Sequence, residues 1–544
     1  MVSHPPSRDL RVLRATQRSS WGRNVGRGLI VPLVCVMGNL QARAQELEAE
    51  ERNRERARAQ AAEASRAELK PLTMKPHPRT GGGRPLLLQD VLRSVDKHYP
   101  VLRIEAQKVE AAEGKRMEAR GVFDLKASAS GYLAPVGYYD YGYVETKLEQ
   151  ATPFWGISVF GGWRYGQGDI PPYYGYLETL RRGEVKAGIV VPLWRDGRID
   201  SRRTGRRRSD LAWQAAKRAY DAARLKIAVE ATSAYWNWVA AGRRYEVIRS
   251  LLELAEQRDS QITQQVEAGA EASLTILENR RAILQRRVAI VRSERALQAA
   301  ALSLSLYLRD SQGRPRNPST QQLPSEIQVL PALPDLSQDD AIRRALKLRP
   351  EIEGYRAEVA RAQTEVDLAK NQVAPKLDMT LAASRDLGSG STDQQTRLNP
   401  TVLEGMVNLS MPLQLRSERG KLKSARAELE SWRVQAEFFY DQIATQVRDT
   451  LSALRAAEAQ VEAAVEGAEV ARRVAEAERT RFQLGATSLL IVNLREQSAA
   501  DAEADAIDAL ANLHVVHARW NAVMGSRRMD SAELPSQSAP ADGP

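Results

Sequence analysis

The chain lacks several residue types on which common protein classes depend. Its 544 residues include one cysteine, Cys35, so no disulfide can form within the chain. There are only six phenylalanines, whereas alanine, arginine, glutamate and glutamine are abundant. This composition favours long helices over a globular core built from aromatic side chains.

Long apolar runs are also absent. Leu29–Met37 is interrupted by Pro32 and is too short to cross a bilayer as a helix. It follows an arginine-rich stretch and precedes Ala42-Arg43-Ala44, an A-x-A cleavage pattern, so residues 1–44 are predicted to be an export signal. No other stretch reaches eighteen apolar residues. We therefore expect an exported chain without a transmembrane helix: periplasmic, secreted, or an outer-membrane barrel.

The sequence contains no catalytic or cofactor-binding pattern. His514 and His517 can share one helix face, but no cysteine or carboxylate completes a metal site around them. The segment Gly388–Ser391 is rich in glycine, yet no lysine follows and no helix begins there, so it is not a phosphate-binding loop. We therefore predict no enzyme activity, no bound metal and no cofactor.

The net charge of +11 permits nucleic acid or anionic lipid as a partner and proves neither. Seven arginines lie within Arg195–Arg208, where a predicted strand gives way to a predicted helix. They fit lipid phosphates at a membrane edge, a nucleic acid, or an ordinary solvated face. No aromatic platform accompanies them, so no nucleic acid is expected. The candidate membrane-edge residues are Arg202, Arg203, Arg206, Arg207 and Arg208.

What the chain does contain is a segment that occurs twice, at Val190–Leu308 and Ser410–Met524. Each copy opens with a short apolar strand ending in Val-Pro-Leu or Met-Pro-Leu. About seventy residues of helical pattern without proline follow. A turn containing Gly269 or Gly485 comes next, and a second helix of about forty residues completes the copy. Such a repeat has to be recognised first because it decides the fold.

The long helical patterns have the seam of a coiled coil, with apolar or small residues every three or four positions. Seventy residues at ~1.5 Å each make a rod of about 100 Å. Shorter helices beginning at Pro100 and Pro350 have the length needed to stack end to end on the return helices. In the first copy, the apolar stripe of the coiled-coil seam runs from Leu211 to Trp236. The second has Leu422, Ala425, Leu429, Trp432, Ala436, Phe439, Ile443, Val447, Leu451 and Leu454.

After each of these shorter helices the hydrophobic period changes from 3.6 to 2. Phe123–Gly131 and Leu377–Ser384 alternate, and Glu184–Leu193 and Leu403–Leu413 are the returning strands. About ten alternating residues suit a barrel strand with one face to lipid and one to a polar lumen. We predict two strands in each copy. Four strands cannot close a barrel, whereas three chains would supply twelve.

The connections between these strands differ. Arg385–Pro400 is short, polar and glycine-rich, whereas Ala134–Gly183 holds eight of the sixteen tyrosines. The aromatics fit a membrane–water interface, a packed surface loop, or an outward-facing receptor surface. Two segments of this loop, Val144–Gln150 and Trp155–Arg164, are candidates for additional strand.

The order and duplicated spacing of these elements resemble the outer membrane efflux protein family, typified by TolC, over Leu86–Gly525. The resemblance implies a trimeric channel: a twelve-stranded barrel in outer-membrane lipid continuing into a periplasmic cylinder of helices. It implies passive conduction, with a periplasmic adaptor protein and an inner-membrane pump as partners. The expected location is the outer membrane, with a periplasmic helical extension.

In that family the adaptor docks near the helix turns, which would be the periplasmic tips. The matching positions are Val266, Gly269, Ala270, Arg481, Leu484, Gly485 and Ala486. The family often narrows the tip with acidic residues six and nine positions after the second glycine. Here these positions are Ile491 and Leu494, with Thr275 and Glu278 in the first copy. We therefore expect an apolar gate, with Glu278 as the only nearby carboxylate; an ordinary solvated helix face is the favoured interpretation of Glu278.

The predicted fold is mainly α with a small β part. Long antiparallel coiled-coil hairpins form two tandem repeats, each with two strands contributing to a trimeric twelve-stranded outer-membrane β-barrel. The predicted function is the exit duct of a tripartite efflux or type I secretion system. The alternative is an exported coiled-coil scaffold without a pore. The predicted segments are an export signal (1–44), an arm and linker (45–85), the first repeat (86–312), a proline-rich linker (313–337), the second repeat (338–525) and a disordered tail (526–544).

Overall fold

The computed structural model of the chain describes residues 84–171, 174, 177–269, 271–324, 326–327, 330, 336–389 and 401–526. All of them belong to one unit, Gly82–Pro544, and the fold of that unit is described here. The predicted export signal, nearly all of the predicted arm, and the tail after residue 526 lie outside the described residues. So do parts of the proline-rich linker and residues 390–400.

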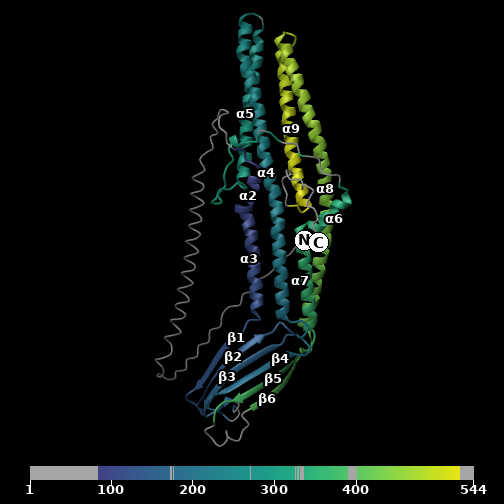
Figure 1. Cartoon of the computed structure of the whole chain (residues 1–544). Coiled ribbons are helices and arrows are strands. Elements are labelled where there is room, and N and C mark those ends of the chain that lie inside the picture. Colours follow the sequence, from purple (N-terminus) through teal and green to yellow (C-terminus); the bar gives the residue numbers. More distant parts are fainter. Residues whose placement is uncertain are drawn as a thin grey trace, which may run out of the picture. The chain divides into compact units, whose positions relative to one another are not determined.

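Two long helical hairpins make up most of this unit (Figure 1). The first consists of α4 (Ser201–Glu267) and α5 (Ser273–Ser305). The second consists of α8 (Arg416–Gln483) and α9 (Leu489–Val523). The outgoing helices have 67 and 68 residues, so the long helices of the two repeats are nearly equal in length. The predicted long helix, tight turn and shorter return helix are confirmed in both repeats.

Two pairs of shorter helices precede the strands. The first pair is α2 (Leu88–His98) and α3 (Pro100–Gly121), and the second is α6 (Gln338–Leu348) and α7 (Pro350–Gln372). Both α3 and α7 start with proline, whose missing N–H has no partner to lose in the first helical turn. The short 3-10 helix η2 (Thr320–Gln322) lies in the connection between the repeats.

The shorter helices continue the return helices end to end, as predicted. Just after α5 ends, the ring of Tyr307 stacks on Tyr99, the residue before α3, with centroids 5.2 Å apart. In the second repeat Gly525, just after α9, lies against the α6–α7 junction. A Cβ on Gly525 would come within 2.8 Å of the Leu348 carbonyl oxygen, so only glycine fits there. Each long helix thus has a neighbour along both halves of its length.

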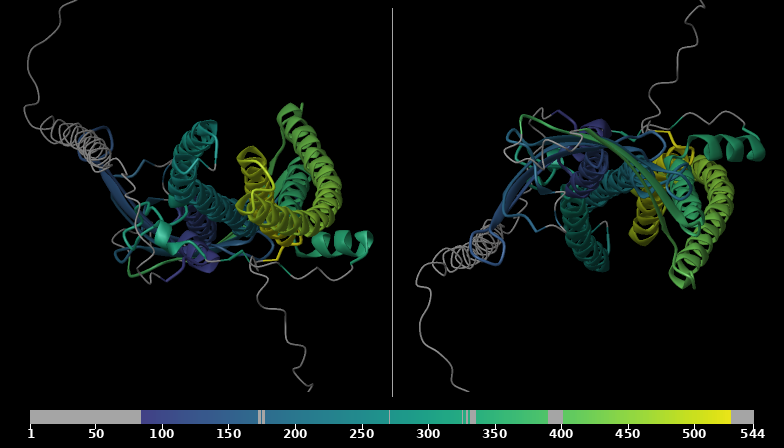
Figure 2. Two further views of the ribbon diagram at one scale, coloured as in Figure 1. Left: turned by 90° about the horizontal axis from the view of Figure 1, so that it is seen from above. Right: turned by 90° about the horizontal axis from the view of Figure 1, so that it is seen from below.

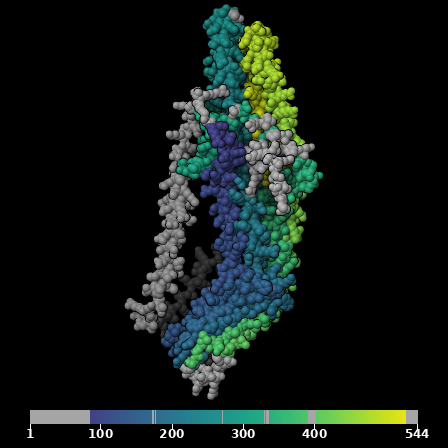
Figure 3. Space-filling view, in the orientation of Figure 1, coloured from purple at the N-terminus to yellow at the C-terminus, as the bar shows by residue number. Residues whose placement is uncertain are grey.

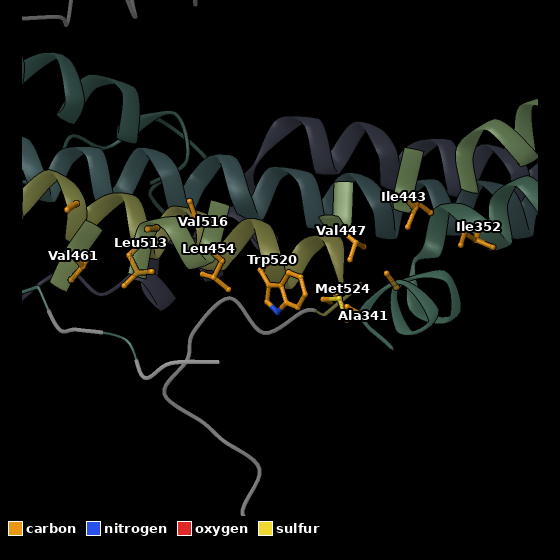
Figure 4. Close-up of a cluster of buried hydrophobic side chains, with 13 residues drawn as sticks. Ala341, Ile352, Ile443, Val447, Leu454, Val461, Leu513, Val516, Trp520 and Met524 are labelled. Atoms are coloured by element: carbon orange, nitrogen blue, oxygen red, sulfur yellow. The ribbon is translucent and has the colours of Figure 1, made fainter. Parts of the chain in front are cut away.

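The predicted seam of α8 is the main apolar core (Figure 4). Ile443 and Val447 are fully buried, and Leu454 is 2% exposed. They pack against α9 residues such as Leu513 and Trp520. A helix this long gains its stability mainly from such packing, because an isolated helix is only marginally stable in water. Within the described residues, no helix has an apolar stretch long enough to cross a membrane.

The strands form one antiparallel sheet at the end of α3, α4, α7 and α8 remote from the hairpin turns (Figures 1 and 3). Seen along the helices, the sheet is curved (Figure 2). Its six strands follow chain order from β1 to β6. They are β1 (Lys126–Ala134), β2 (Tyr141–Ala151), β3 (Ser158–Gly168), β4 (Glu184–Pro192), β5 (Lys376–Asp386) and β6 (Thr401–Ser410).

The four predicted strands are confirmed as β1, β4, β5 and β6, but the prediction of two strands in each repeat is wrong for the first one. The segment expected mainly as a loop contains β2 and β3, close to the two segments proposed as additional strand. Strand β2 pairs with β1 and β3. The prediction failed because the many glycines of this segment are typical of turns. The backbone pairing with β1 and β4 that makes these segments strands is not visible in the local pattern.

Val447→Ala and Val470→Ala test the importance of the α8 seam. Val447 is fully buried, whereas Val470 on the same helix is 53% exposed. Truncating Val447 should cost about 2–3 kcal/mol, from lost apolar burial and the cavity left behind. Val470→Ala should leave stability nearly unchanged. Thermal unfolding followed by far-ultraviolet circular dichroism measures both, and equal midpoints for the two variants would contradict the proposed packing.

Candidate functional site

The two hairpin turns are built around glycines with left-handed backbone conformation. Gly269 has φ +74° and Gly485 has φ +69°. Nothing lies within 4 Å of a Cβ placed on either, so space is not what requires glycine there. The backbone conformation requires it, because other residues rarely adopt it. After α8 the turn is closed by the N–H of Ala486, which donates to the Arg481 carbonyl at 2.8 Å.

The residues predicted to bind an adaptor lie at these turns. Leu484 is 77% exposed, and Val266 is half-buried one residue before α4 ends. The Arg481 guanidinium donates to Glu478 at 3.3 Å. Ala270 lies outside the described residues. The turns therefore present a small surface of mixed apolar and basic character.

The gate candidates lie in the first turns of the return helices. Ile491 and Leu494 on α9 are 41% and 63% exposed. On α5, the Thr275 hydroxyl donates to Glu271 at 3.3 Å, and Glu278 is half-buried. The second repeat thus presents apolar groups at these positions, and the first repeat presents polar ones.

A buried ionic cluster near the tips was not predicted from the sequence. Its centre is Glu496 on α9, whose side chain is fully buried. The carboxylate accepts hydrogen bonds from Arg258 on α4, from Arg286 on α5 at 3.0 Å, and from Arg479 on α8 at 2.7 Å. One carboxylate therefore joins all four helices of the two hairpins.

The arginines determine the charge state of Glu496. Burial by itself would raise the pKa of the Glu496 carboxyl, but the positive charges and hydrogen bonds of Arg258, Arg479 and Arg286 outweigh it, and the pKa is lowered. For Arg286, burial dominates and lowers the pKa of its guanidinium. The Asn493 side-chain oxygen accepts from Arg258 and Arg286, at 3.3 Å each. The cluster is therefore an ionised carboxylate held between three guanidinium groups.

A sequence signal for this cluster does exist. Leu489, Val492 and Glu496 follow one another at helical spacing, and all three are buried on α9. A carboxylate in an otherwise apolar stripe needs a partner, because an unpaired buried charge is very costly. Its partners come from three other helices, however, and the sequence does not indicate which arginines they are.

Most of the predicted membrane-edge arginines have partners within the chain. Arg203 donates to Asp200 at 2.7 Å, and Arg202 to the Ser158 hydroxyl at 3.0 Å. Arg208 donates to Glu365 at 2.8 Å. Arg206 and Arg207 are exposed at the start of α4, directly beside the sheet. These two are the remaining candidates for binding lipid phosphates.

The two histidines have ordinary structural surroundings. The ring of His514 stacks on Trp236 with centroids 3.7 Å apart. Burial lowers the pKa of the His517 imidazole, which favours its neutral form. Among the described residues, no group of three or more histidine, cysteine, aspartate or glutamate side chains is placed to hold a metal ion.

The two faces of β4, β5 and β6 differ in polarity. The strand register places Ile189 beside Leu381, and Leu381 beside Gly405, on one face. Leu403, Val407 and Leu409 lie on the same face of β6 and are 64–82% exposed. The opposite face carries an ion pair between Lys186 and Glu404. An exposed apolar face and a charged opposite face match the alternation of a membrane-barrel strand.

Comparison with known proteins agrees with this architecture. Residues 341–526 match the model of a family described as outer membrane efflux protein, which corresponds to the second repeat. No curated protein sequence matches the chain.

Several solved structures of outer-membrane proteins share the fold. The CmeC outer membrane channel of Campylobacter jejuni is 15% identical, with a TM-score of 0.56 over 80% of this chain and 85% of that one. VceC of Vibrio cholerae is 16% identical, with a TM-score of 0.57 over 81% and 96%. The open state of the Neisseria gonorrhoeae MtrE channel is 16% identical, with a TM-score of 0.55 over 82% and 91%. The predicted family resemblance is thus confirmed.

Glu496→Gln should weaken the association of the two hairpins. It keeps the side chain's size but removes its charge. The largely buried guanidinium groups of Arg258 and Arg286, and the partly exposed one of Arg479, then lose this counter-ion. Breaking a buried ion pair in this way costs about 3–5 kcal/mol. Glu503→Gln, an exposed position on the same helix, is the matched control and should have little effect. The unfolding midpoint of each variant measures the difference; a Glu496→Gln midpoint as high as the control would show that the cluster does not stabilise the fold.

Proposed function

From the match of residues 341–526 to the outer membrane efflux protein family we propose that the chain is an outer-membrane exit duct. Three copies close a barrel in the lipid, and their helical hairpins form a tube in the periplasm. The duct belongs to a tripartite efflux or type I secretion system. Conduction through the duct is passive.

The observation that carries this proposal is the sheet. Its strands have 9–11 residues, the length of a membrane-crossing strand, and its exposed face is apolar. Strands β1 and β6 are its edges, each with a neighbour on one side only. Open edges do not occur in lipid, because the unpaired backbone groups cost several kcal/mol each. Further copies of the chain would supply the missing neighbours.

A second observation supports assembly of the helical part. On α5, the exposed residues Leu277, Leu284, Val288 and Val291 follow one another at steps of seven, four and three. These are the steps of a coiled-coil seam, and these side chains are 50–66% exposed in the single chain. Helices from another copy would cover the stripe in an assembled tube.

The proposed partners are those implied by the family, and each is assigned to residues at one end of the unit. We infer that a periplasmic adaptor protein docks at the hairpin turns around Gly269 and Gly485, and that an inner-membrane pump drives transport through it. At the other end, Arg206 and Arg207 face the phosphates of the inner leaflet of the outer membrane. Arginines close to that surface are attracted by the negative charge of the phosphates.

The closed state of the duct depends on the tips. Three copies of Ile491 and Leu494 converge there and form an apolar constriction, which can exclude water and ions without a charged ring. The Glu496 cluster keeps the two hairpins of each chain together. Opening therefore requires the hairpins to move as a unit or the cluster to break.

The purified protein should form a trimer that carries a steady ionic current in a planar lipid bilayer. Its mass in detergent is measured alongside the current. A trimer with current supports the duct. A monomer or dimer that never enters the bilayer would contradict it and would leave the alternative of an exported coiled-coil scaffold.

The apolar gate is tested in the same bilayer by replacing Ile491 and Leu494 together with serine. Polar side chains hydrate the constriction, so conductance should rise about two- to tenfold. Val434→Ser is the control: it also exchanges an exposed aliphatic residue for serine, but it lies in the first third of α8, far from the tip. An unchanged conductance in an intact trimer would place the constriction elsewhere.

A further inference from the structure

The hairpin β2–β3 sits between β1 and β4 inside the sheet, although its sequence reads as part of a long loop. All nine residues of β1 pair with β2, and all eleven residues of β2 pair with β3. Strand β3 pairs with β4 from Ser158 to Arg164. In this sheet β2 is therefore the one neighbour of β1.

The hairpin returns fully to the helical end of the sheet. Its turn, residues 152–157, is held there by the Trp155 indole N–H, which donates to the Pro192 carbonyl at 3.2 Å. Just before the turn, the Gln150 amide donates to the Phe123 carbonyl at 2.8 Å. Just after it, Ser158 accepts from Arg202 on α4 at 3.0 Å. A loop projecting away from the barrel would not have its tip fixed to the base of α3 and α4.

The apolar face of the sheet continues across the hairpin without a break. The register places Val144 beside Tyr165, Thr146 beside Trp163, and Leu148 beside Gly161. Beyond them, Trp163 lies beside Val185 and Val159 beside Ile189, both on the apolar face of β4. The four large aliphatic and aromatic residues Val144, Leu148, Val159 and Trp163 are 38–48% exposed.

The charged residues of the hairpin all lie on the other face. Glu145, Lys147 and Glu149 alternate with the apolar residues of β2, and Arg164 faces the same way on β3. Arg164 pairs with Glu184 of β4, and Lys147 with Glu149 at 3.0 Å. Elsewhere on the apolar face there is one charged residue, Arg385, next to the end of β5. The hairpin therefore obeys the same inside–outside rule as the strands predicted from the sequence.

We propose that β2 and β3 are membrane-crossing strands of the barrel wall, with Val144, Leu148, Val159 and Trp163 against lipid acyl chains. This rests on the proposed duct. Each chain then contributes six strands, and three chains close an eighteen-stranded barrel instead of the expected twelve. A hairpin adds one upward and one downward strand. Edges β1 and β6 therefore still run in opposite directions and pair antiparallel between chains.

The hairpin widens the duct at its exit only. Barrel diameter grows roughly in proportion to the number of strands, so eighteen strands give about 1.5 times the width of twelve. With strands ~4.8 Å apart and tilted by ~40°, this is about 36 Å between backbones instead of about 24 Å. The hairpin adds no helix, so the tube below keeps its width. It also lines the lumen with Glu145, Lys147, Glu149 and Arg164.

Spin labels test whether the hairpin crosses the membrane. In a Cys35→Ser background, single cysteines replace residues 144 to 148, and each receives a nitroxide. The trimer is placed in phosphatidylcholine–phosphatidylglycerol vesicles, and collisions with oxygen, which is enriched in lipid, are compared with collisions with a water-soluble nickel chelate. The oxygen-to-nickel ratio should be about threefold higher at 144, 146 and 148 than at 145 and 147.

Labels at Leu381 and Thr380 on β5 are the control, since they lie on opposite faces of a strand predicted independently. Alternation on β5 with uniformly high nickel access on β2 would overturn the hairpin proposal alone. The absence of alternation on both strands would overturn the barrel itself. Electron cryomicroscopy of the trimer gives the number of strands in the barrel wall directly. Eighteen strands are expected. Twelve strands, with the hairpin outside the wall, would refute the proposal.

Discussion

The structure depends on burying a narrow apolar seam along helices of 67 and 68 residues. A helix of this length in water needs a neighbour wherever its apolar stripe runs, because packing supplies most of its stability. The return helices α5 and α9 cover one half of each long helix, and α3 and α7 cover the other. The stacked tyrosines at Tyr99 and Tyr307, and the close approach at Gly525, keep these shorter helices in line.

Polar groups then decide how the two hairpins are joined. The apolar seams of α4 and α8 are similar, so packing alone would tolerate a shift of one hairpin along the other. Glu496 restricts this, because its carboxylate has hydrogen-bonding partners on all three other helices only in one arrangement. A buried ionic group is a weak source of net stability, but it penalises any arrangement that leaves it unpaired. In a duct that opens at its tips, the same cluster would define which movements keep each chain intact.

The sheet forms the end of the unit that lies opposite the hairpin turns. Its exposed apolar face and its unpaired edges are unfavourable for a chain alone in water. Both become favourable in lipid with neighbouring copies. The first repeat adds a hairpin here that the second repeat lacks, so the two repeats match in their helices and differ in their strands. The likeness to solved outer-membrane channels shows the fold, whereas the strand count is a property of this chain.

The sequence by itself determined the elements whose signal is local. The 3.6-residue period, proline at 100 and 350, and glycine at 269 and 485 predicted the helices and turns, and the period of two predicted β1, β4, β5 and β6. Only the tertiary structure decided the pairing of β2 with β1, the partners of Glu496, and the internal contacts of Arg202 and Arg208. These depend on groups 44 to 238 residues apart in several cases, such as Arg202 with Ser158 and Arg258 with Glu496. No local pattern encodes such contacts, because an arginine or tyrosine side chain is also stable in solvent, and only the fold brings its partner close.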